Sequence, residues 1–252
     1  MKIFLSPAKK LDLKSKFPNY DYNKPVFLDE AKQLINVMRQ KSPDEIKNLM
    51  NLSDNLANLN WERYQTWNYL HTTDFARPAI YTFNGNVYDG LDIHSFNEAD
   101  IFKSNEYIRI ISGLYGVLKP FDLIYPYRLE MGTKLSFENY NNLYDFWRDK
   151  VTDYINNELK DNELIVNLAS QEYFKAIDRN KLQNPVVDIV FKEFKNDELK
   201  VISIYAKIAR GLMTRFIIQN NIKTKEELKL FNKDGYQFDL DLSNENTLVF
   251  TR

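Results

Sequence analysis

The sequence predicts one domain of mixed α/β class over residues 1–252, and three observations lead to this prediction. Short apolar runs of strand length alternate with stretches whose apolar residues recur at helical spacing. No Gly/Ser-rich linker, internal repeat or low-complexity segment divides the chain. Toward the C-terminus, strand-like runs stand in close pairs, which is typical of hairpins. We therefore expect helices flanking a mixed, partly antiparallel sheet.

The predicted strands are short and rich in β-branched and aromatic residues. The segments Val186–Tyr205 and Tyr236–Thr251 are interpreted as the hairpins that make the sheet partly antiparallel. In chain order, the predicted strands are Lys2–Leu5, Ala79–Phe83, Ile108–Ile111, Leu164–Asn167, Val186–Phe194, Val201–Tyr205, Tyr236–Leu242 and Thr247–Thr251.

Helices are predicted between these runs. Asp29–Arg39 and Leu143–Leu159 each carry an apolar stripe at helical spacing. Ser42, followed by Pro43 and Glu45, has the signature of a capped helix start. That helix would break near Asn51-Leu52, and Ser53-Asp54 would cap a second short helix. We expect this pair to pack on the protein body with three leucines buried, namely Leu49, Leu52 and Leu56.

Composition excludes several classes of protein. The chain has no cysteine, which excludes a thiol peroxidase, a thiol redox sensor and a zinc-thiolate site. The net charge of -1 does not imply wholesale binding to nucleic acid, so such binding would need local clusters of cations. No apolar run is long enough for a signal peptide or a membrane span. We expect a cytoplasmic protein without membrane association.

Four predicted strands run into loops of similar character. These loops begin at Ser6, Asn84, Ser112 and Asn167, and they offer amides, hydroxyls and phenols. Because ligands bind beyond the carboxyl ends of strands in open parallel sheets, the loops are expected to meet around one crevice. Alternatively, their glycines simply form turns. The side chains expected to line the crevice are Ser6, Asn84, Tyr88, Ser112, Tyr115, Asn167 and Ser170.

The segment Val201–Asn220 predicts a helix with a cationic side. If a helix follows the predicted strand, Lys207 and Arg210 lie on one side, and Arg215 lies about 40° beyond them. Arginine suits phosphate because its planar fork donates two parallel hydrogen bonds. Gly211 in the middle of this helix costs about 1 kcal/mol relative to alanine. Close approach of a ligand or partner would explain it, and so would tight packing.

Arg128 and Glu130 face the same way if their segment is extended. They form either a structural ion pair or a ligand anchor beside an acid/base group. The two histidines, His71 and His94, lack metal-ligand spacing, and no P-loop, Gly-x-Gly-x-x-Gly or Ser-His-Asp pattern is present. We therefore predict no metal site and no cofactor.

A set of longer motifs resembles the YaaA family of bacterial peroxide-stress proteins, in the same order and at similar spacing, from Met1 to about Phe250. The most specific is Pro-Tyr-Arg-Leu-Glu-Met-Gly. The motifs lie at Ser6–Lys9, Gly85–Leu91, Ser112–Leu118, Pro126–Gly132, Asn167–Ser170 and Ala206–Met213.

The resemblance implies protection from hydrogen peroxide through limitation of free iron, DNA binding rather than a known enzymatic activity, and an α/β fold with a positively charged cleft. It also implies a helix-hairpin-helix-like element, which by position would be Pro43–Asn60. Two departures from the family pattern stand out. Asn51-Leu52-Ser53 contains no glycine where such hairpins usually have Gly-x-Gly, and Asn84 stands where the family tends to have lysine.

The first functional hypothesis is a peroxide-stress protein that binds double-stranded DNA with little sequence preference. Its phosphate contacts would be Lys9, Lys10, Arg128, Lys175, Lys207, Arg210 and Arg215. The rival is an enzyme acting on a phosphorylated small molecule or nucleobase, with Glu130 or Tyr88 as the acid/base. A third hypothesis is an iron-handling or partner-binding protein, for which only carboxylate ligands are plentiful.

Overall fold

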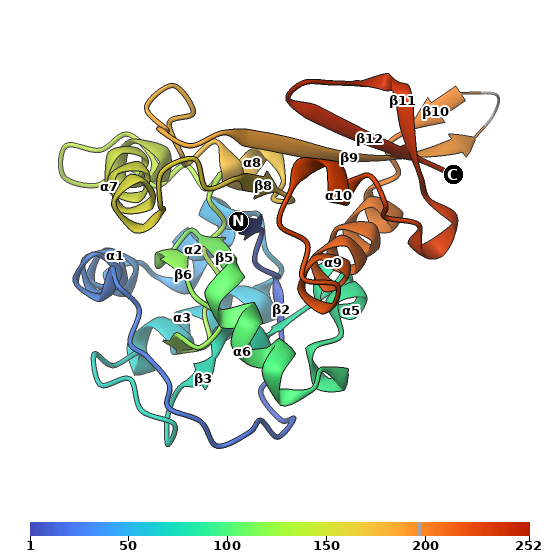
Figure 1. Cartoon of the computed structure of the whole chain (residues 1–252). Helices are drawn as coiled ribbons and strands as arrows, with labels where there is room; N and C mark the ends of the chain where they lie inside the picture. Colours follow the sequence, from blue (N-terminus) through green and yellow to red (C-terminus); the bar gives the residue numbers. More distant parts are fainter. Residues whose placement is uncertain (196–197) are drawn as a thin grey trace.

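The computed structural model describes residues 1–195 and 198–252, and its centre is a mixed sheet (Figure 1). The strands of this sheet are β1 (Lys2–Leu5), β5 (Ile108–Ser112), β6 (Gly116–Leu118), β8 (Ile165–Asn167), β9 (Val186–Lys195), β10 (Glu198–Lys200), β11 (Gln237–Asn244) and β12 (Thr247–Thr251). Their order is β11–β12–β9–β8–β1–β5–β6, and β10 pairs with β9. The five strands from β12 to β5 run parallel, whereas β6, β10 and β11 are antiparallel to their neighbours. The predicted mixed, partly antiparallel sheet is confirmed.

Strand β1 lies at the centre of the sheet. Ile3 is in register with Ile108 of β5 and with Val166 of β8. All four residues of β1 are buried, as expected for a parallel strand covered on both faces. Because these strands are parallel, the loops that follow Leu5, Ser112 and Asn167 leave the sheet at the same edge. We call this edge the carboxyl end of the sheet.

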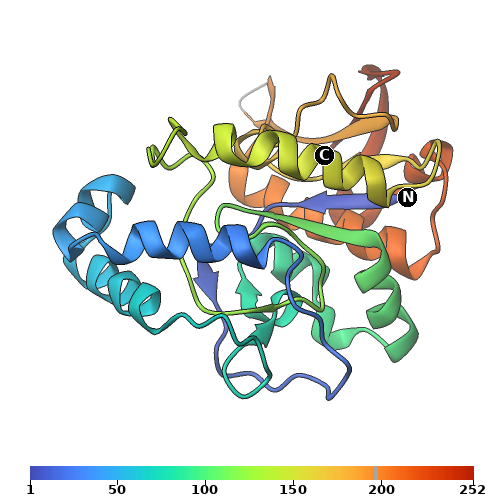
Figure 2. The ribbon, with the colours of Figure 1, turned by 90° about the vertical axis from the view of Figure 1, so that its left-hand side faces the viewer.

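Helices lie on both sides of the sheet (Figures 1 and 2). Helices α1 and α7 are on one side, and α6 and α9 are on the other. None of the helices in the described part of the chain is long and apolar enough to cross a membrane. That a single domain spans residues 1–252 stays a prediction. The helices are α1 (Leu28–Arg39), α2 (Pro43–Met50), α3 (Asp54–Thr66), α4 (Ala79–Thr82), α5 (Asn86–Leu91), α6 (Glu98–Tyr107), α7 (Leu143–Glu158), α8 (Gln171–Phe174), α9 (Ser203–Gln219) and α10 (Lys225–Leu228).

The predicted strand Ala79–Phe83 is wrong over most of its length. Its first four residues form the short helix α4, and only Phe83–Asn84 is a strand, β4, which pairs with β2 (Lys10–Leu11). The Ala79 amide donates to the Asp122 carbonyl oxygen at 2.9 Å, so the run is tied to a distant loop. A fully buried apolar run has no period that separates helix from strand, and here tertiary contacts decided the outcome.

The predicted strand Val201–Tyr205 is also wrong. The second strand of that hairpin is Glu198–Lys200, and α9 already begins at Ser203. Val201 and Tyr205 are exposed, so their strand preference has no neighbouring sheet to satisfy it. The helical pattern that follows extends back instead, with the Ala206 amide donating to the Ile202 carbonyl oxygen.

Helices α2 and α3 form the predicted pair joined by a tight turn, and they stand at the left edge of Figure 2. The predicted capping box is present, because the Ser42 side chain and Glu45 exchange hydrogen bonds with each other's backbone amides. Asn51 ends α2 in the left-handed region, and Ser53 caps α3. Leu52 is buried as predicted, whereas Leu49 is half-buried.

The predicted burial of Leu56 is wrong, because 39% of this residue is exposed. Ala57, Asn60 and Tyr64 form the buried face of α3 instead. The contacts establish two helices joined by a turn, and they do not show the helix-hairpin-helix motif that the resemblance implies.

Helices α5 and α9 approach each other at backbone distance. A Cβ on Gly211 would overlap the Val87 carbonyl oxygen and lie 2.6 Å from the Leu91 amide nitrogen. A Cβ on Gly90 would likewise overlap the Ile208 carbonyl oxygen. Tight helix packing therefore explains Gly211, and this residue does not belong to an open cationic side of α9.

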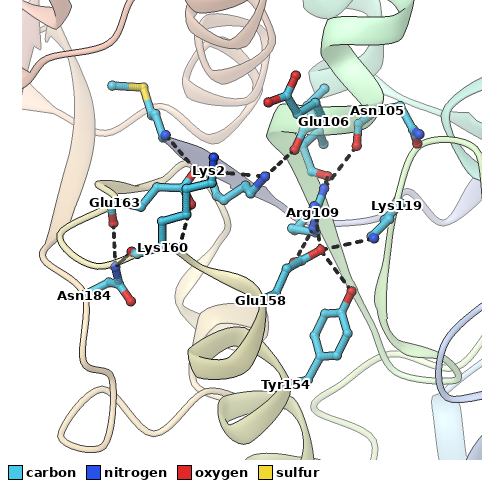
Figure 3. Close-up of polar contacts among 12 residues, drawn as sticks. Lys2, Asn105, Glu106, Arg109, Lys119, Tyr154, Glu158, Lys160, Glu163 and Asn184 are labelled. Atoms are coloured by element: carbon cyan, nitrogen blue, oxygen red, sulfur yellow. Dashed lines mark hydrogen bonds and ion pairs between the residues drawn. The ribbon is translucent and has the colours of Figure 1, made fainter.

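The amino ends of the central strands carry a network of paired charges (Figure 3). Arg109, in β5, donates to both carboxylate oxygens of Glu158 at 2.7 Å each. Lys119 Nζ lies 3.2 Å from the same carboxylate, and the Tyr154 hydroxyl donates to it at 3.1 Å. Burial by itself would raise the pKa of Glu158, but its hydrogen bond and ion pair with Arg109 outweigh burial and lower the pKa to about 2.

Further groups at this end are also paired. The Met1 amino group lies 2.8 Å from Glu163, and Lys2 Nζ donates to the Glu106 carbonyl oxygen at 2.7 Å. A pocket of about 610 Å³ lies at this end and is lined by Lys2, Arg109, Glu158 and Asp122; we call it the amino-end pocket. Asp122 accepts a hydrogen bond from the Lys119 amide. Burial raises the pKa of Asp122 to about 7, although the Lys119 amide and nearby cations act against this rise.

Candidate functional site

The loops at the carboxyl end of the sheet contact one another directly. Ser6, after β1, accepts a hydrogen bond from the Ser170 amide at 2.8 Å, and the two hydroxyl oxygens are 3.3 Å apart. The Tyr88 hydroxyl donates to the Ser6 carbonyl oxygen at 3.0 Å. Lys10 pairs with Asn84 in the short β2–β4 ladder. The loops after β1, β4 and β8 thus form one connected surface.

The loop after β5 leaves the same end of the sheet and is buried. Ser112 is fully buried and lies 2.6 Å from the Tyr127 hydroxyl, and its Oγ accepts hydrogen bonds from the Leu114 and Tyr115 amides. The Tyr115 hydroxyl accepts from Trp67 Nε1 at 2.9 Å. Ser112 and Tyr115 were predicted to line a crevice, but both are buried, so they support the loops rather than face a ligand.

Glu130 is held between two cations. Lys9 Nζ lies 2.7 Å from one carboxylate oxygen, and Arg128 donates to the other from Nε and Nη2 at 3.1 and 2.9 Å. The Tyr64 hydroxyl, from α3, donates to the Arg128 carbonyl oxygen and so fixes this loop. Arg128 and Glu130 therefore form an ion pair, the first of the two sequence-based alternatives, and Lys9 adds a second cation to it.

Tyr88 is poorly suited to proton transfer. It is 8% exposed, and burial raises the pKa of its hydroxyl well above its ordinary value. The hydroxyl already donates to a backbone carbonyl oxygen. Among the described residues, no group of three or more His, Asp or Glu side chains is placed to hold a metal ion.

Arg215 is engaged at the end of α5. Its Nη1 donates to the carbonyl oxygens of Leu91 and Asp92 at 3.1 Å each and to the Ser95 hydroxyl at 2.7 Å. The guanidinium also lies over the Phe96 ring, 4.9 Å from its centroid. Nη1 also lies 3.6 Å from the Asp92 carboxylate, so these contacts tie Arg215 to the end of a helix.

Four of the seven predicted phosphate-binding cations form no ion pair within residues 1–195 and 198–252. Lys10 and Lys207 are exposed and have no side-chain partner there. Lys175 is exposed and lies over the Tyr144 ring, 5.2 Å from its centroid. Arg210 is half-buried, and burial lowers the pKa of its guanidinium. Lys9, Arg128 and Arg215 have the protein partners described above.

A pocket of about 670 Å³ lies beyond the carboxyl end of β8 and brings Asn167, Lys175 and Arg210 together. Sequence reasoning missed six further polar residues of its wall, namely Arg148 of α7, Gln171, Asp178, Arg179, Asp188 of β9 and Thr247. Arg148 and Asp188 lie within apparently ordinary amphipathic elements, so their spacing gave no signal. A single crevice shared by all four loops stays a prediction.

Comparisons with known proteins agree over the whole chain. A family model described as peroxide stress protein YaaA matches residues 1–242. A UPF0246 protein of Flavobacterium psychrophilum is 52% identical over 252 residues, covering 100% of both chains. One from Marinomonas sp. is 53% identical over 253 residues, covering 100% of this chain and 97% of the relative. One from Saccharophagus degradans is 45% identical over 254 residues, covering 100% and 99%.

Proposed function

The chain belongs to the YaaA family of peroxide stress proteins, and from that premise we propose that it protects DNA during peroxide stress by binding the duplex in the cytoplasm with little sequence preference. This protection would limit the oxidative damage that free iron drives. The phosphate contacts would come from the carboxyl end of the sheet, through Lys10, Lys175, Lys207 and Arg210.

The observation that carries the proposal is the contrast in pairing among the basic residues there. These four cations have no carboxylate partner in the described chain, whereas Lys9, Arg128 and Arg215 do. Unpaired lysine and arginine side chains can neutralise phosphates without first breaking a protein ion pair. Such contacts position a duplex but carry no sequence information, which fits low specificity.

The elements that carry these cations are joined by direct contacts. Lys10 pairs with Asn84, two residues before α5, and α5 packs at backbone distance on α9, the helix of Lys207 and Arg210. Arg210 and Lys175 line the same pocket. A phosphate backbone following this path would meet each cation in turn. The α2–α3 pair is a secondary candidate, because Lys47 is already paired with Asp54 at 2.5 Å.

The rival proposal of an enzyme acting on a phosphorylated small molecule or nucleobase draws support from the same pocket. However, the two acid/base candidates of the enzyme hypothesis are poorly placed for proton transfer. Glu130 is held by two cations, and the Tyr88 hydroxyl is buried and already donates a hydrogen bond. We therefore place DNA binding first.

Salt-dependent titration tests DNA binding directly. The probe is a fluorescent duplex whose two ends are closed by hairpin loops, so that strand ends play no part. For wild type, log affinity should fall linearly with log salt. Lys207→Ala should weaken binding to all sequences about equally and reduce the slope by about 0.9.

Lys160→Ala is the matched control for this titration. Lys160 is exposed, forms no ion pair with the described residues, and precedes β8 at the opposite end of the sheet. Its removal should leave affinity and slope unchanged. Equal losses in both variants, or no salt dependence for wild type, would contradict the proposed interface.

A further inference from the structure

The pocket beyond β8 is built from elements far apart in the sequence. Arg148 comes from α7, Lys175 and Arg179 follow α8, Arg210 comes from α9, and Asp188 lies in β9. Its volume of about 670 Å³ is in the range of small-molecule sites. Figure 1 shows α7 and α9 on opposite sides of the sheet, with α8 between them. The pocket is therefore a meeting point of both helical layers at the carboxyl end of the sheet.

Two arginines in this wall have no anionic partner. Within residues 1–195 and 198–252, neither Arg148 nor Arg210 forms an ion pair or a side-chain hydrogen bond, although both are half-buried. Buried charges in proteins are normally paired, because removing them from water is costly. Lys175 adds a third positive charge to the same pocket. This arrangement favours an anionic ligand that two guanidinium groups can share.

Two carboxylates line the pocket, Asp178 and Asp188, and in the described residues neither forms an ion pair with Arg148, Lys175 or Arg210. Asp178 accepts a hydrogen bond from the Asn180 amide at 3.1 Å. Asp188 accepts a hydrogen bond from Asn167 Nδ2 at 2.8 Å on one oxygen and from Arg179 Nη1 at 2.7 Å on the other. These two contacts fix the carboxylate against the wall. Because a carboxylate has about four acceptor sites, it can still accept from a hydroxyl or amino group of a ligand.

The wall also has an apolar part, which includes Phe174, Ile177, Ile189 and Val190. A free phosphate ion would leave this surface uncovered, and a sugar phosphate offers little apolar area to match it. A ligand that satisfies all three parts of the wall has a phosphate, a hydroxyl-bearing ring and a flat, largely apolar ring system.

We propose that this pocket binds one nucleotide carrying a 5′-phosphate monoester, with Arg148 and Arg210 on the phosphate, Asp188 on a sugar hydroxyl and the base against the apolar wall. The nucleotide is either free or the 5′ end of a DNA strand. The second source rests on the proposed DNA-binding function, and the first does not. A strand end suits the pocket better than an interior phosphodiester, because the chain continues from only one side of the nucleotide.

Calorimetric titration with deoxyadenosine 5′-monophosphate tests the free nucleotide, with deoxyadenosine as the comparison. The monophosphate should bind at least about tenfold more tightly than the nucleoside. Arg148→Gln and Arg210→Ala should each weaken its binding about ten- to a hundredfold, since hydrogen bonds to charged groups contribute about 1.5–3 kcal/mol. Lys160→Ala should bind the monophosphate like wild type. Circular dichroism checks that each variant is folded, and Arg210→Lys replaces Arg210→Ala if that variant is not.

A second arm tests the strand end. A blunt duplex with 5′-phosphates is compared with the same duplex bearing 5′-hydroxyls. Tighter binding of the phosphorylated duplex, lost in Arg148→Gln, identifies the strand end as the source. Binding of the monophosphate without this preference identifies a free nucleotide. If the protein distinguishes neither the monophosphate from the nucleoside nor the two duplexes, the inference is overturned. The closed-ended duplex still reports on the proposed function alone, so the two proposals fail separately.

Discussion

The pockets at the two ends of the central strands differ in how their cations are paired. At the amino end, Arg109 and Lys119 both reach the carboxylate of Glu158, and the Met1 amino group reaches Glu163. At the carboxyl end, Arg148 and Arg210 are half-buried without a carboxylate partner in the described chain, while the pocket they line is of similar size. Paired charges stabilise a fold, whereas unpaired cations leave electrostatic free energy available to a ligand. The comparison therefore separates a structural end of the sheet from the end at which we propose binding.

Glu158→Ala should have the largest effect on stability. The change leaves Arg109, which is 3% exposed, without its bidentate partner. Breaking a buried ion pair by removing one member costs about 3–5 kcal/mol. Denaturant unfolding followed by far-ultraviolet circular dichroism measures this loss. A loss below about 1 kcal/mol would mean that the amino-end network is not structural.

Gly211→Ala tests whether the carboxyl end is held by packing rather than by charges. The new Cβ would overlap the backbone of α5, where neither partner is a flexible side chain. Overpacking costs typically about 1–3 kcal/mol, and a backbone clash belongs at the upper end of this range. Thermal unfolding provides the measurement. As a control, Ala209→Gly, two residues away on α9, should cost only about 1 kcal/mol from helix propensity plus a small loss of packing.

The pH dependence of stability tests the role of Asp122 in the amino-end pocket. The folded pKa of Asp122, about 7, lies above its ordinary value of 3.8, so the folded state retains a proton that the unfolded state has lost. The unfolding free energy should therefore fall as pH rises from about 4 to 7. Between pH 5 and pH 8, this effect should lower the unfolding free energy of the wild type by about 2–3 kcal/mol, and Asp122→Asn should abolish that decrease.

The variant must be compared with wild type at each pH, because His71 works in the opposite direction. Burial lowers the pKa of His71 to about 4, so its contribution to stability is lost as pH falls below its ordinary value of 6.5. This term is common to both proteins and cancels in the difference. Parallel pH profiles of wild type and Asp122→Asn would refute the role assigned to Asp122.

Arg210→Ala should have the smallest effect on stability, within about 1 kcal/mol, because no protein carboxylate loses a partner. The change removes a half-buried, uncompensated charge, so a slight gain is expected. Chemical unfolding of Arg210→Ala and Glu158→Ala side by side compares the two losses of unfolding free energy directly. A loss as large as that of Glu158→Ala would show that Arg210 is structural and that the two ends of the sheet do not differ.

Much of the fold could be predicted because it depends on local sequence patterns. Strands β1, β5 and β8, helices α1 and α7, and the Ser42–Glu45 capping box follow from periodicity and cap chemistry. The two wrong strands, Ala79–Phe83 and Val201–Tyr205, are short apolar runs without a clear period. In the first, hydrogen bonds to residues near Asp122 imposed a helical turn. In the second, no neighbouring strand was available.

The sequence predicted several cations of the candidate site, but it did not predict which of them have partners within the protein. Lys175, Lys207 and Arg210 stand out from the sequence as cations in a promising region. That Arg215 caps α5 could not be seen, because its partners at Leu91 and Ser95 lie more than a hundred residues earlier. Arg148 lies within a helix of ordinary amphipathic pattern, so the sequence did not mark it as a candidate site residue.

The sequence by itself determined most of the helices and strands, that the sheet is mixed, and to which family the chain belongs, because each depends on neighbouring residues or on long motifs. Only the tertiary structure decided which charges are paired. Lys9 meets Glu130 and Arg109 meets Glu158 across long stretches of chain, while Arg148 and Arg210 meet no carboxylate in the described residues. The reason is physical: an ion pair requires a few ångströms of separation, and the folded chain, not the order of residues, sets that distance.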